Sequence, residues 1–392
     1  MLVNTAQIRE AFTPRQSESL FDVPLMYSML MLIGVGFVMV TSASMPVAER
    51  LFDNPYHFTY RHVVFLIGSL ILFWFATNVP MTWWKRSNPY LLLFGLVLLV
   101  AVLIIGREVN GAKRWIPLGP FGLQVAEASK LFFFSYIAGY LVRKREEVQE
   151  NIKGFAKPIL VFAAYAFLIL MQPDLGTVVV MFVTTVGLLF LAGAKLWQFF
   201  TLMLTGVSLV VVLIIIEPYR MKRVVGFLNP WEDPFGAGYQ LVQSLMAYGQ
   251  GGWLGQGLGN SIQKLQYLPE AHNDFIFAVI AEELGFVGVL SIIVMLGVLV
   301  TRALFIGQKA LKAGQEYEGY LALGIGIWFA FQAVVNIGAS AGILPTKGLT
   351  LPFVSYGGSS LWVMTIAAGI LQRVDFETKM STRQATSRGG RR

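Results

Sequence analysis

A short acidic stretch stands directly before one of the long apolar runs of this chain. The sequence YLPEAHNDFIFAVIAEELG places Glu270, His272 and Asp274 just ahead of the run. A carboxylate at a helix N-terminus accepts hydrogen bonds from free N–H groups, and this capping role suits Asp274. The same carboxylate can also take a proton from a substrate hydroxyl, and the two roles are compatible. His272 is the rival base, because an ordinary histidine has a pKa of about 6.5.

Two further carboxylates, Glu282 and Glu283, lie inside the apolar run. They stand about 12 to 14 Å beyond Asp274 along a helix that rises 1.5 Å per residue, so they belong to a different site. Carboxylates within a membrane are usually paired or face a watery cavity, and we predict pairing with Lys130. Lys130 has two alternative roles: an internal pair with Glu127, three residues earlier on the same helix face, or a place in the wall of an anion-binding cavity.

The composition shows which kind of fold must position these groups. Of 392 residues, 56% are hydrophobic and 13% are charged, and the mean hydropathy is +0.64. These values exclude an ordinary soluble domain and predict an all-α, polytopic membrane protein with about ten transmembrane helices. The apolar segments lie near residues 24–44, 62–79, 90–106, 123–142, 158–171, 175–194, 199–216, 275–301, 319–343 and 351–371.

The net charge of +8 has a membrane explanation. Most of the Lys and Arg residues fall on alternate connections, which is the positive-inside pattern and not a nucleic-acid-binding surface. The pattern places both termini in the cytoplasm, and no removable signal peptide is expected. We predict three parts: a cytoplasmic segment 1–23, a membrane domain 24–374, and a disordered basic cytoplasmic tail 375–392.

Two connections on the predicted outer face are too elaborate to be turns. Residues 217–274 form a large loop between the seventh and eighth predicted helices, and its YQLVQSLMAYG stretch predicts an amphipathic helix in the membrane interface. The connection REVNGAKRWIPLGPFG links the third and fourth helices. We therefore place the chemistry on the outer face.

The two outer connections carry basic clusters, which run against the charge bias. Their members are Lys113, Arg114, Arg220, Lys222 and Arg223. The clusters either contact water and lipid headgroups or clamp a pyrophosphate.

Two stretches rich in small residues complete the pattern. The glycine run GQGGWLGQGLGNS is either a flexible loop or a place where the backbone closely approaches a sugar or phosphate. The stretch SYGGSS is expected within the last helix, for close helix packing or as a polar cavity wall. Motifs for nucleotide hydrolysis, zinc chemistry and a serine nucleophile are absent from the sequence.

Several of these motifs, in this order, resemble one family. NGAKRWIPLG, EASK, QPDLGT, NPWEDPFGAGYQ, PEAHNDFIFAVIAEELG and GILPTKGLTLPFVSYGGSS are similar to the SEDS proteins (shape, elongation, division and sporulation). These proteins are bacterial peptidoglycan glycosyltransferases, and the resemblance runs from about residue 20 to 375. NGAKRW, LVRKREEV and KLQYLPEAHNDFIF resemble the cell-division branch more than the elongation branch, which remains the alternative.

The resemblance implies an activity: polymerisation of the lipid-linked precursor lipid II into glycan strands. It maps the family's essential aspartate onto Asp274, which would act as general base in an inverting transfer. The expected substrate-binding residues are Lys113, Arg114, Lys130, Arg220, Lys222, Arg223, Glu127 and His272. A magnesium or manganese ion bridging Asp274 or Glu270 to the pyrophosphate is a further expectation.

The resemblance also implies partners and a location. A class B penicillin-binding protein would supply transpeptidation, other division proteins would join it, and no nucleic acid is expected. The protein would lie in the bacterial inner membrane at the division septum. The competing functions are a lipid II flippase and a scaffold for division proteins, although paired or inverted repeats typical of transporters are not apparent.

Overall fold

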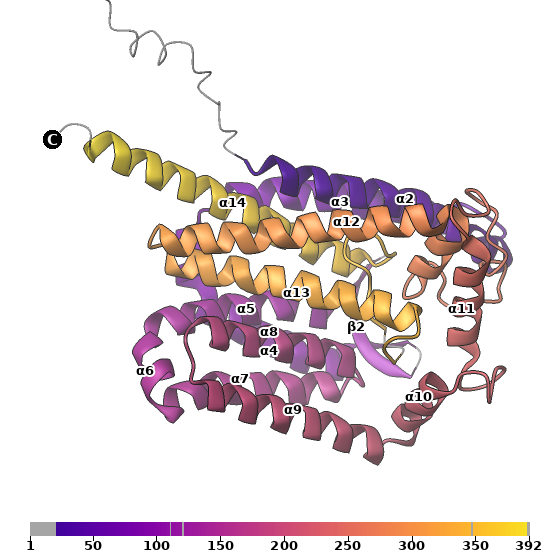
Figure 1. Cartoon of the computed structure of the whole chain (residues 1–392), viewed down its shortest axis with the longest axis horizontal. Helices are drawn as coiled ribbons and strands as arrows, with labels where there is room; N and C mark the ends of the chain where they lie inside the picture. Colours follow the sequence, from indigo (N-terminus) through magenta and orange to yellow (C-terminus); the bar gives the residue numbers. More distant parts are fainter. Residues whose placement is uncertain (1–20, 110, 120, 346–347, 390–392) are drawn as a thin grey trace, which may run out of the picture.

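The computed structural model is a bundle of long helices that run side by side (Figure 1). It describes residues 21–109, 111–119, 121–345 and 348–389. The helices are α2 (Val23–Phe52), α3 (His57–Asn78), α4 (Met81–Ile105), α5 (Val125–Arg143), α6 (Arg145–Glu150), α7 (Ile152–Leu170), α8 (Leu175–Leu191), α9 (Leu196–Ile216), α10 (Pro218–Leu228), α11 (Tyr239–Gly251), α12 (Ile276–Lys312), α13 (Glu316–Ser340) and α14 (Gly358–Gly389). The strands are β1 (Arg107–Val109), β2 (Ala112–Leu118) and β3 (Phe121–Gln124).

The all-α membrane fold is confirmed, whereas the count of ten crossings is not. Eight helices in the described residues are long and apolar enough to cross a membrane, namely α2, α3, α4, α5, α7, α9, α12 and α13. Helix α8 is apolar but has only 17 residues. Helix α14 begins at Gly358 and combines an apolar half with a polar tail.

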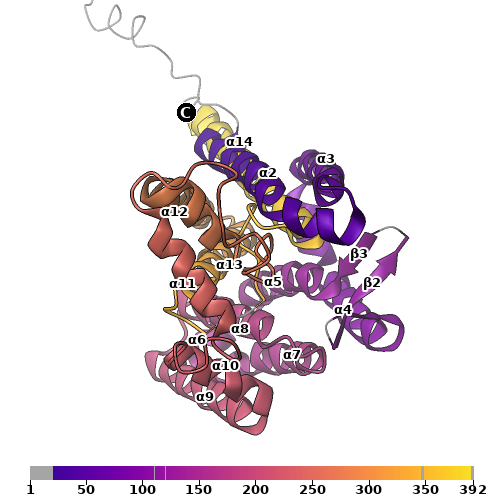
Figure 2. The ribbon, with the colours of Figure 1, turned by 90° about the vertical axis from the view of Figure 1, so that its right-hand side faces the viewer.

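Helices α5 and α13 form the interior of the bundle. In the most apolar 18-residue stretch of each helix, 78% of the residues are buried in α5 and 72% in α13. Helix α9 lies at the periphery, and none of the residues in its apolar window is buried (Figures 1 and 2). A helix that is apolar all round and faces outward has hydrocarbon as its natural surroundings.

The two ends of the bundle differ in structure. The end here called the sheet end carries the three strands, α10 and α11, and the opposite end, the α6 end, carries α6 and the start of α7 (Figure 1). The strands form an antiparallel sheet in the order β1-β2-β3, and β3 leads directly into α5. Helix α11 confirms the amphipathic helix predicted in the large loop, and its apolar side packs against α12.

The predicted basic tail 375–392 begins inside helix α14, and the disorder expected for it stays a prediction. Helix α14 continues to Gly389. The carboxylate of Asp375 pairs with Lys379 at 2.5 Å and with Lys309 of α12 at 3.7 Å. The hydroxyl of Thr378 donates to the Gln315 side chain. Lys309 and Gln315 therefore tie the first residues of this polar segment to the rest of the bundle. Residues 1–20 of the predicted N-terminal segment lie outside the described residues.

Helix α12 is interrupted at Gly285, where the glycine run packs against it. Gly285 has φ 64° and ψ −164°, and a Cβ there would lie 2.3 Å from the backbone nitrogen of Gly255. The amides of Gln256 and Gly257 donate to the carbonyls of Glu282 and Glu283 at 2.9 and 3.1 Å. The glycine run therefore lies close to the backbone of α12, and the alternative predicted for it, a close approach to a sugar or phosphate, stays a prediction.

The side chains of Glu282 and Glu283 anchor the same loop. Glu282 accepts a hydrogen bond from the amide of Ile262 at 2.8 Å. Glu283 forms a buried ion pair with Lys264 at 2.7 Å and accepts a hydrogen bond from Ser42 of α2. The predicted pairing of these carboxylates with Lys130 is therefore wrong, because Lys264 is brought to Glu283 by a loop whose path the sequence did not reveal.

This buried pair generates a stability prediction. The substitution Lys264→Met leaves Glu283 buried without a counter-ion, and breaking such a pair typically costs about 3–5 kcal/mol. We expect a lower midpoint of chemical unfolding in detergent, and the double substitution Lys264→Met with Glu283→Met should recover most of the loss. Lys312→Met, at an exposed lysine on α12, is the control. A single Lys264→Met variant as stable as the wild type would contradict the prediction.

Candidate active site

The acidic stretch folds as a turn that precedes α12. Glu270 has a left-handed backbone with φ 55°, and its carbonyl accepts the amides of Asn273 at 3.0 Å and Phe275 at 3.4 Å. Helix α12 begins at Ile276, with Phe275 at the cap position and no side-chain cap. The capping role predicted for Asp274 is therefore wrong, because the turn carries the chain one residue past Asp274 before the helix starts.

Asn336 of α13 fixes the position of Asp274 from inside the bundle. Its side-chain amide donates to the Asp274 carbonyl at 3.0 Å and to the Leu349 carbonyl at 2.6 Å. Asn336 is only 1% exposed, and its hydrogen bond to Leu349 is fully buried while the one to Asp274 is partly buried. One buried amide therefore joins α13, the acidic turn and the segment before α14.

The segment before α14 holds the turn from the other side. The Ser355 hydroxyl donates to the Asn273 carbonyl at 2.8 Å, and the Tyr356 amide donates to the His272 carbonyl at 3.0 Å. Both residues belong to the SYGGSS stretch that was expected inside the last helix. Ser355 and Tyr356 precede the helix instead, and their hydrogen bonds position the turn.

The surroundings of Asp274 make it a suitable proton acceptor. Burial raises the pKa of its carboxyl to about 7, and the neighbouring Glu270 carboxylate adds to the rise. Arg223 and Arg114 act in the opposite direction, and Asp174 adds a smaller rise. The residue remains partly exposed, so a substrate can reach it. A carboxyl with a pKa near 7 suits general acid–base chemistry at neutral pH.

His272 lies beside Asp274 in the sequence but is enclosed by aromatic rings. Its ring centroid lies 5.1 Å from that of Phe58 and 5.6 Å from that of Tyr356, and the residue is 8% exposed. Burial lowers its pKa, although the Glu270 carboxylate opposes the shift. A buried imidazole with a lowered pKa is a weaker base, so Asp274 is the better candidate. A substrate contact of His272 stays a prediction.

Two of the predicted cations come together around Asp274. Arg114 of β2 and Arg223 of α10 both act on its carboxyl electrostatically. The Arg114 guanidinium is held by hydrogen bonds to the carbonyls of Gln172 at 2.8 Å and Pro173 at 2.7 Å, between α7 and α8. The Arg223 guanidinium lies over the Tyr219 ring, 5.1 Å from its centroid.

The other outer cations have separate surroundings. Arg220 donates to the Leu213 carbonyl at 2.9 Å, which ties α10 to α9. Lys113 and Lys222 are exposed on β2 and α10. A contact of these three residues with a pyrophosphate stays a prediction.

Lys130 and Glu127 form the internal pair that was one of the sequence alternatives. The Lys130 ammonium lies 2.9 Å from the Glu127 carboxylate, 3.1 Å from the Gln332 side-chain oxygen and 5.0 Å from the centre of the Trp328 ring. Lys130 is fully buried, so it has no surface for direct contact with a substrate in this structure. Gln332 in turn donates to the Thr350 carbonyl at 3.0 Å, which links the pair to the segment that holds the acidic turn.

The acidic turn offers no protein cage for a divalent cation among the described residues, and the cation expected there stays a prediction. Among the described residues, no group of three or more His, Asp or Glu side chains is placed to hold a metal ion. Asp274 and Glu270 interact electrostatically, as two carboxylates of one site do. Magnesium commonly takes one or two carboxylates together with water and substrate phosphates, so this pair fits that mode.

Two buried amides of α13 were not predicted as part of the site: Asn336, which holds the turn, and Gln332, which holds the segment beside it. A signal was present, because these two amides stand four residues apart inside an apolar segment and therefore share one helix face. A buried amide without a partner is costly, so such a pair indicates hydrogen bonds to another segment. Which segment accepts them depends on the tertiary structure.

Comparison with known proteins identifies relatives along nearly the whole chain. The family profile FTSW_RODA_SPOVE, described as cell cycle protein, matches residues 23–380. The chain is 78% identical over 387 residues to the probable peptidoglycan glycosyltransferase FtsW of Pseudoalteromonas translucida, covering 99% of this chain and 97% of that protein. It is 55% identical over 372 residues to the protein of the same name from Escherichia coli, covering 95% of this chain and 90% of that protein.

Solved structures share the fold. A chain of a peptidoglycan synthase complex, described for its coordination of polymerization and crosslinking, is 30% identical with a TM-score of 0.73, covering 91% of this chain and 97% of the other. The rod shape determining protein RodA of Thermus thermophilus is 26% identical with a TM-score of 0.66, covering 91% and 96%. The predicted resemblance and its cell-division branch are confirmed, and the chain belongs to the FtsW, RodA and SpoVE family of cell cycle proteins.

Proposed function

We propose that this protein is a peptidoglycan glycosyltransferase that polymerises lipid II into glycan strands during septal wall synthesis, with Asp274 as general base. The observation that carries the proposal is the Asp274 carboxyl itself. Its turn is held by hydrogen bonds from Asn336 and Ser355. Burial raises the pKa of the carboxyl to about 7, and Arg114 and Arg223 lie within electrostatic reach of it. The FtsW relatives support the cell-division role rather than the elongation role.

The reaction follows from these groups. Asp274 takes the proton of the acceptor hydroxyl of lipid II as the oxygen attacks the anomeric carbon of the lipid-linked chain. A new C–O bond forms with inversion, and the bond from the anomeric carbon to the pyrophosphate oxygen breaks. The electron pair leaves with the lipid pyrophosphate. Arg114 and Arg223 stabilise the charge that develops there, which removes the need for an acid catalyst.

A divalent cation fits this scheme as an additional positive charge on the pyrophosphate. Asp274 and Glu270 are the residues that would hold it, and magnesium or manganese suits oxygen ligands. When bound, the ion would stabilise the leaving group as a Lewis acid.

The partner and location extend the proposal. The structural neighbour from a peptidoglycan synthase complex supports a class B penicillin-binding protein as the crosslinking partner. Such a pair would lie in the inner membrane at the septum, with both termini in the cytoplasm and the sheet end in the periplasm. A flippase role finds no comparable support, because the relatives are named as glycosyltransferases.

Substitution of the proposed base tests the function directly. Asp274→Asn keeps the size of the side chain but cannot accept the proton, so polymerisation of labelled lipid II should fall by a factor of about 100 to 10,000. His272→Gln is the comparison variant and should lose much less. An Asp274→Asn enzyme within a few fold of the wild type would overturn the assignment and direct attention to His272 and Glu270.

The pH dependence should report the ionisation of Asp274. The base is active when deprotonated, and its pKa is raised to about 7. The kcat/KM for lipid II should therefore rise about tenfold per pH unit below the midpoint and level off above it. Glu270→Gln removes a charge that raises the pKa and should move the midpoint down, whereas Arg223→Gln should move it up. A midpoint that neither substitution shifts would show that another group controls the rate.

The buried amide of Asn336 should act as a positioning group. Asn336→Ala removes the hydrogen bond to the Asp274 carbonyl in the turn and the one to the Leu349 carbonyl beside it. A displacement of about 1 Å at a catalytic group can cost about 100-fold in rate. We expect kcat to fall by about 10- to 100-fold with little change in KM. The matched control is Tyr165→Phe, in which a buried side chain loses its hydrogen bond to the Leu92 carbonyl away from the turn. Equal losses in the two variants would indicate a general effect on stability.

A further inference from the structure

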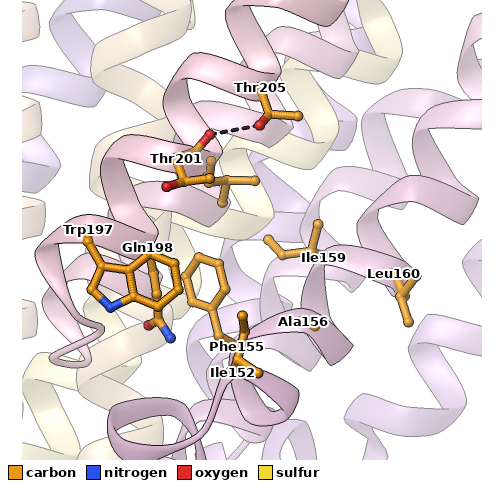
Figure 3. A pocket seen from close by; sticks show the side chains of 10 residues that line it. Ile152, Phe155, Ala156, Ile159, Leu160, Trp197, Gln198, Thr201 and Thr205 are labelled. Carbon is orange, nitrogen blue, oxygen red and sulfur yellow. Dashed lines mark hydrogen bonds between the residues drawn. The ribbon is translucent and has the colours of Figure 1, made fainter.

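An apolar groove opens on the surface between α7 and α9, near the α6 end of the bundle (Figure 3). Its volume is about 320 Å³. Six of its lining residues are Phe155, Ile159 and Leu160 of α7 and Trp197, Thr201 and Leu202 of α9. The groove is separate from the acidic turn, because that turn lies with α11 and the sheet at the other end of the bundle (Figure 1).

The groove has the length and chemistry of a site for a hydrocarbon chain. On α7 it runs from Ile152 to Leu160 and on α9 from Trp197 to Thr205. Each stretch covers about 12 Å at 1.5 Å per residue. This length approaches the roughly 15 Å that one leaflet contributes to the hydrocarbon core. Apolar cavities do not hold water, and an empty groove forgoes dispersion contacts, so a lipid chain is its natural occupant.

The mouth of the groove is basic. Lys153 is exposed and adjoins the lining residue Ile152. Lys195 is exposed at the start of α9, and its ammonium lies 3.3 Å from the Glu150 carbonyl, so it reaches the corner between α6 and α7. The N-terminal ends of α7 and α9, which carry positive partial charge, lie at the same corner.

Acidic side chains near the mouth do not cancel this charge. Glu147 is paired with Lys144 and with Lys157, and Glu316 is paired with Arg145. Residues 143–157 together with Lys195 and Glu316 carry six basic and four acidic side chains: Arg143, Lys144, Arg145, Lys153, Lys157 and Lys195 against Glu146, Glu147, Glu150 and Glu316. The corner therefore attracts an anion.

We propose that this groove binds an anionic phospholipid, with one acyl chain between α7 and α9 and the headgroup phosphate between Lys153 and Lys195. The apolar walls hold the chain, and the lysines select the charge of the headgroup. A basic side chain near an anionic lipid surface strengthens binding about fivefold, so the two lysines together supply about 25-fold selectivity over a zwitterionic lipid.

Native mass spectrometry of the purified full-length protein tests the proposal. The protein is titrated with phosphatidylglycerol or with phosphatidylcholine of identical acyl chains, and the Kd for the first retained lipid is measured. The wild type should retain phosphatidylglycerol about 25-fold more tightly. The double variant Lys153→Gln with Lys195→Gln should bind both lipids equally. Lys312→Gln, at an exposed lysine of α12, should behave as the wild type.

A second variant tests the groove itself. Thr201 is exposed in the groove wall, so Thr201→Trp should fill the groove without disturbing the core, and it should weaken retention of both lipids. Equal retention of the two lipids by the wild type would overturn the proposal. An unaltered Kd in Thr201→Trp, or a loss of selectivity in Lys312→Gln as large as that in the double variant, would also overturn it.

Discussion

A buried amide on α13 joins the segments that form the candidate active site. Asn336 donates to the carbonyls of Asp274 and Leu349, which belong to segments that lie far apart in the sequence. Each carbonyl is thereby satisfied inside a bundle where water is scarce, and leaving either unpaired would be costly. The same two hydrogen bonds fix the place of the acidic turn relative to α13, and hence the position of the Asp274 carboxyl.

The pKa of the Asp274 carboxyl is set by burial and by several charged neighbours, not by a single partner. Burial and Glu270 favour the protonated form, while Arg223 and Arg114 favour the carboxylate. The pKa of the carboxyl is therefore close to neutral pH, which suits the proposed role as a general base. The two arginines come from β2 and α10, so both elaborate connections of the sheet end contribute to one site. The length of the two connections is what brings Arg114 and Arg223 within electrostatic reach of the acidic turn.

Buried ion pairs elsewhere in the bundle have a structural role. Lys130 with Glu127 lies beside the Gln332 amide, which holds the Thr350 carbonyl. Lys264 with Glu283 fastens the glycine-rich loop to α12 and α2. Both pairs lie in an apolar interior where an isolated charge is expensive. Their hydrogen bonds therefore favour one arrangement of the helices and loops, and the loops are what shape the sheet end.

The sequence alone determined the class of fold and the main catalytic candidate. Hydropathy predicted the apolar helices because each must cover the thickness of a bilayer. The amphipathic pattern of α11 could also be recognised, because the 3.6-residue helical period appears within a short stretch of sequence. Asp274 stood out because a carboxylate beside an apolar run is unusual. The charged residues of the two long connections were also recognisable, since they break the positive-inside pattern.

Only the tertiary structure decided which charges meet. The sequence could not show that Lys264 rather than Lys130 pairs with Glu283, or that Ser355 and Tyr356 precede α14 and hold the turn. It also assigned Asp274 to a helix cap, and that prediction failed because contacts with distant segments hold the acidic stretch in a turn that ends one residue later. Hydropathy and helical periodicity depend only on residues that are close together in the sequence. Partners of buried polar groups are set by how loops return to the bundle, and that information is not local.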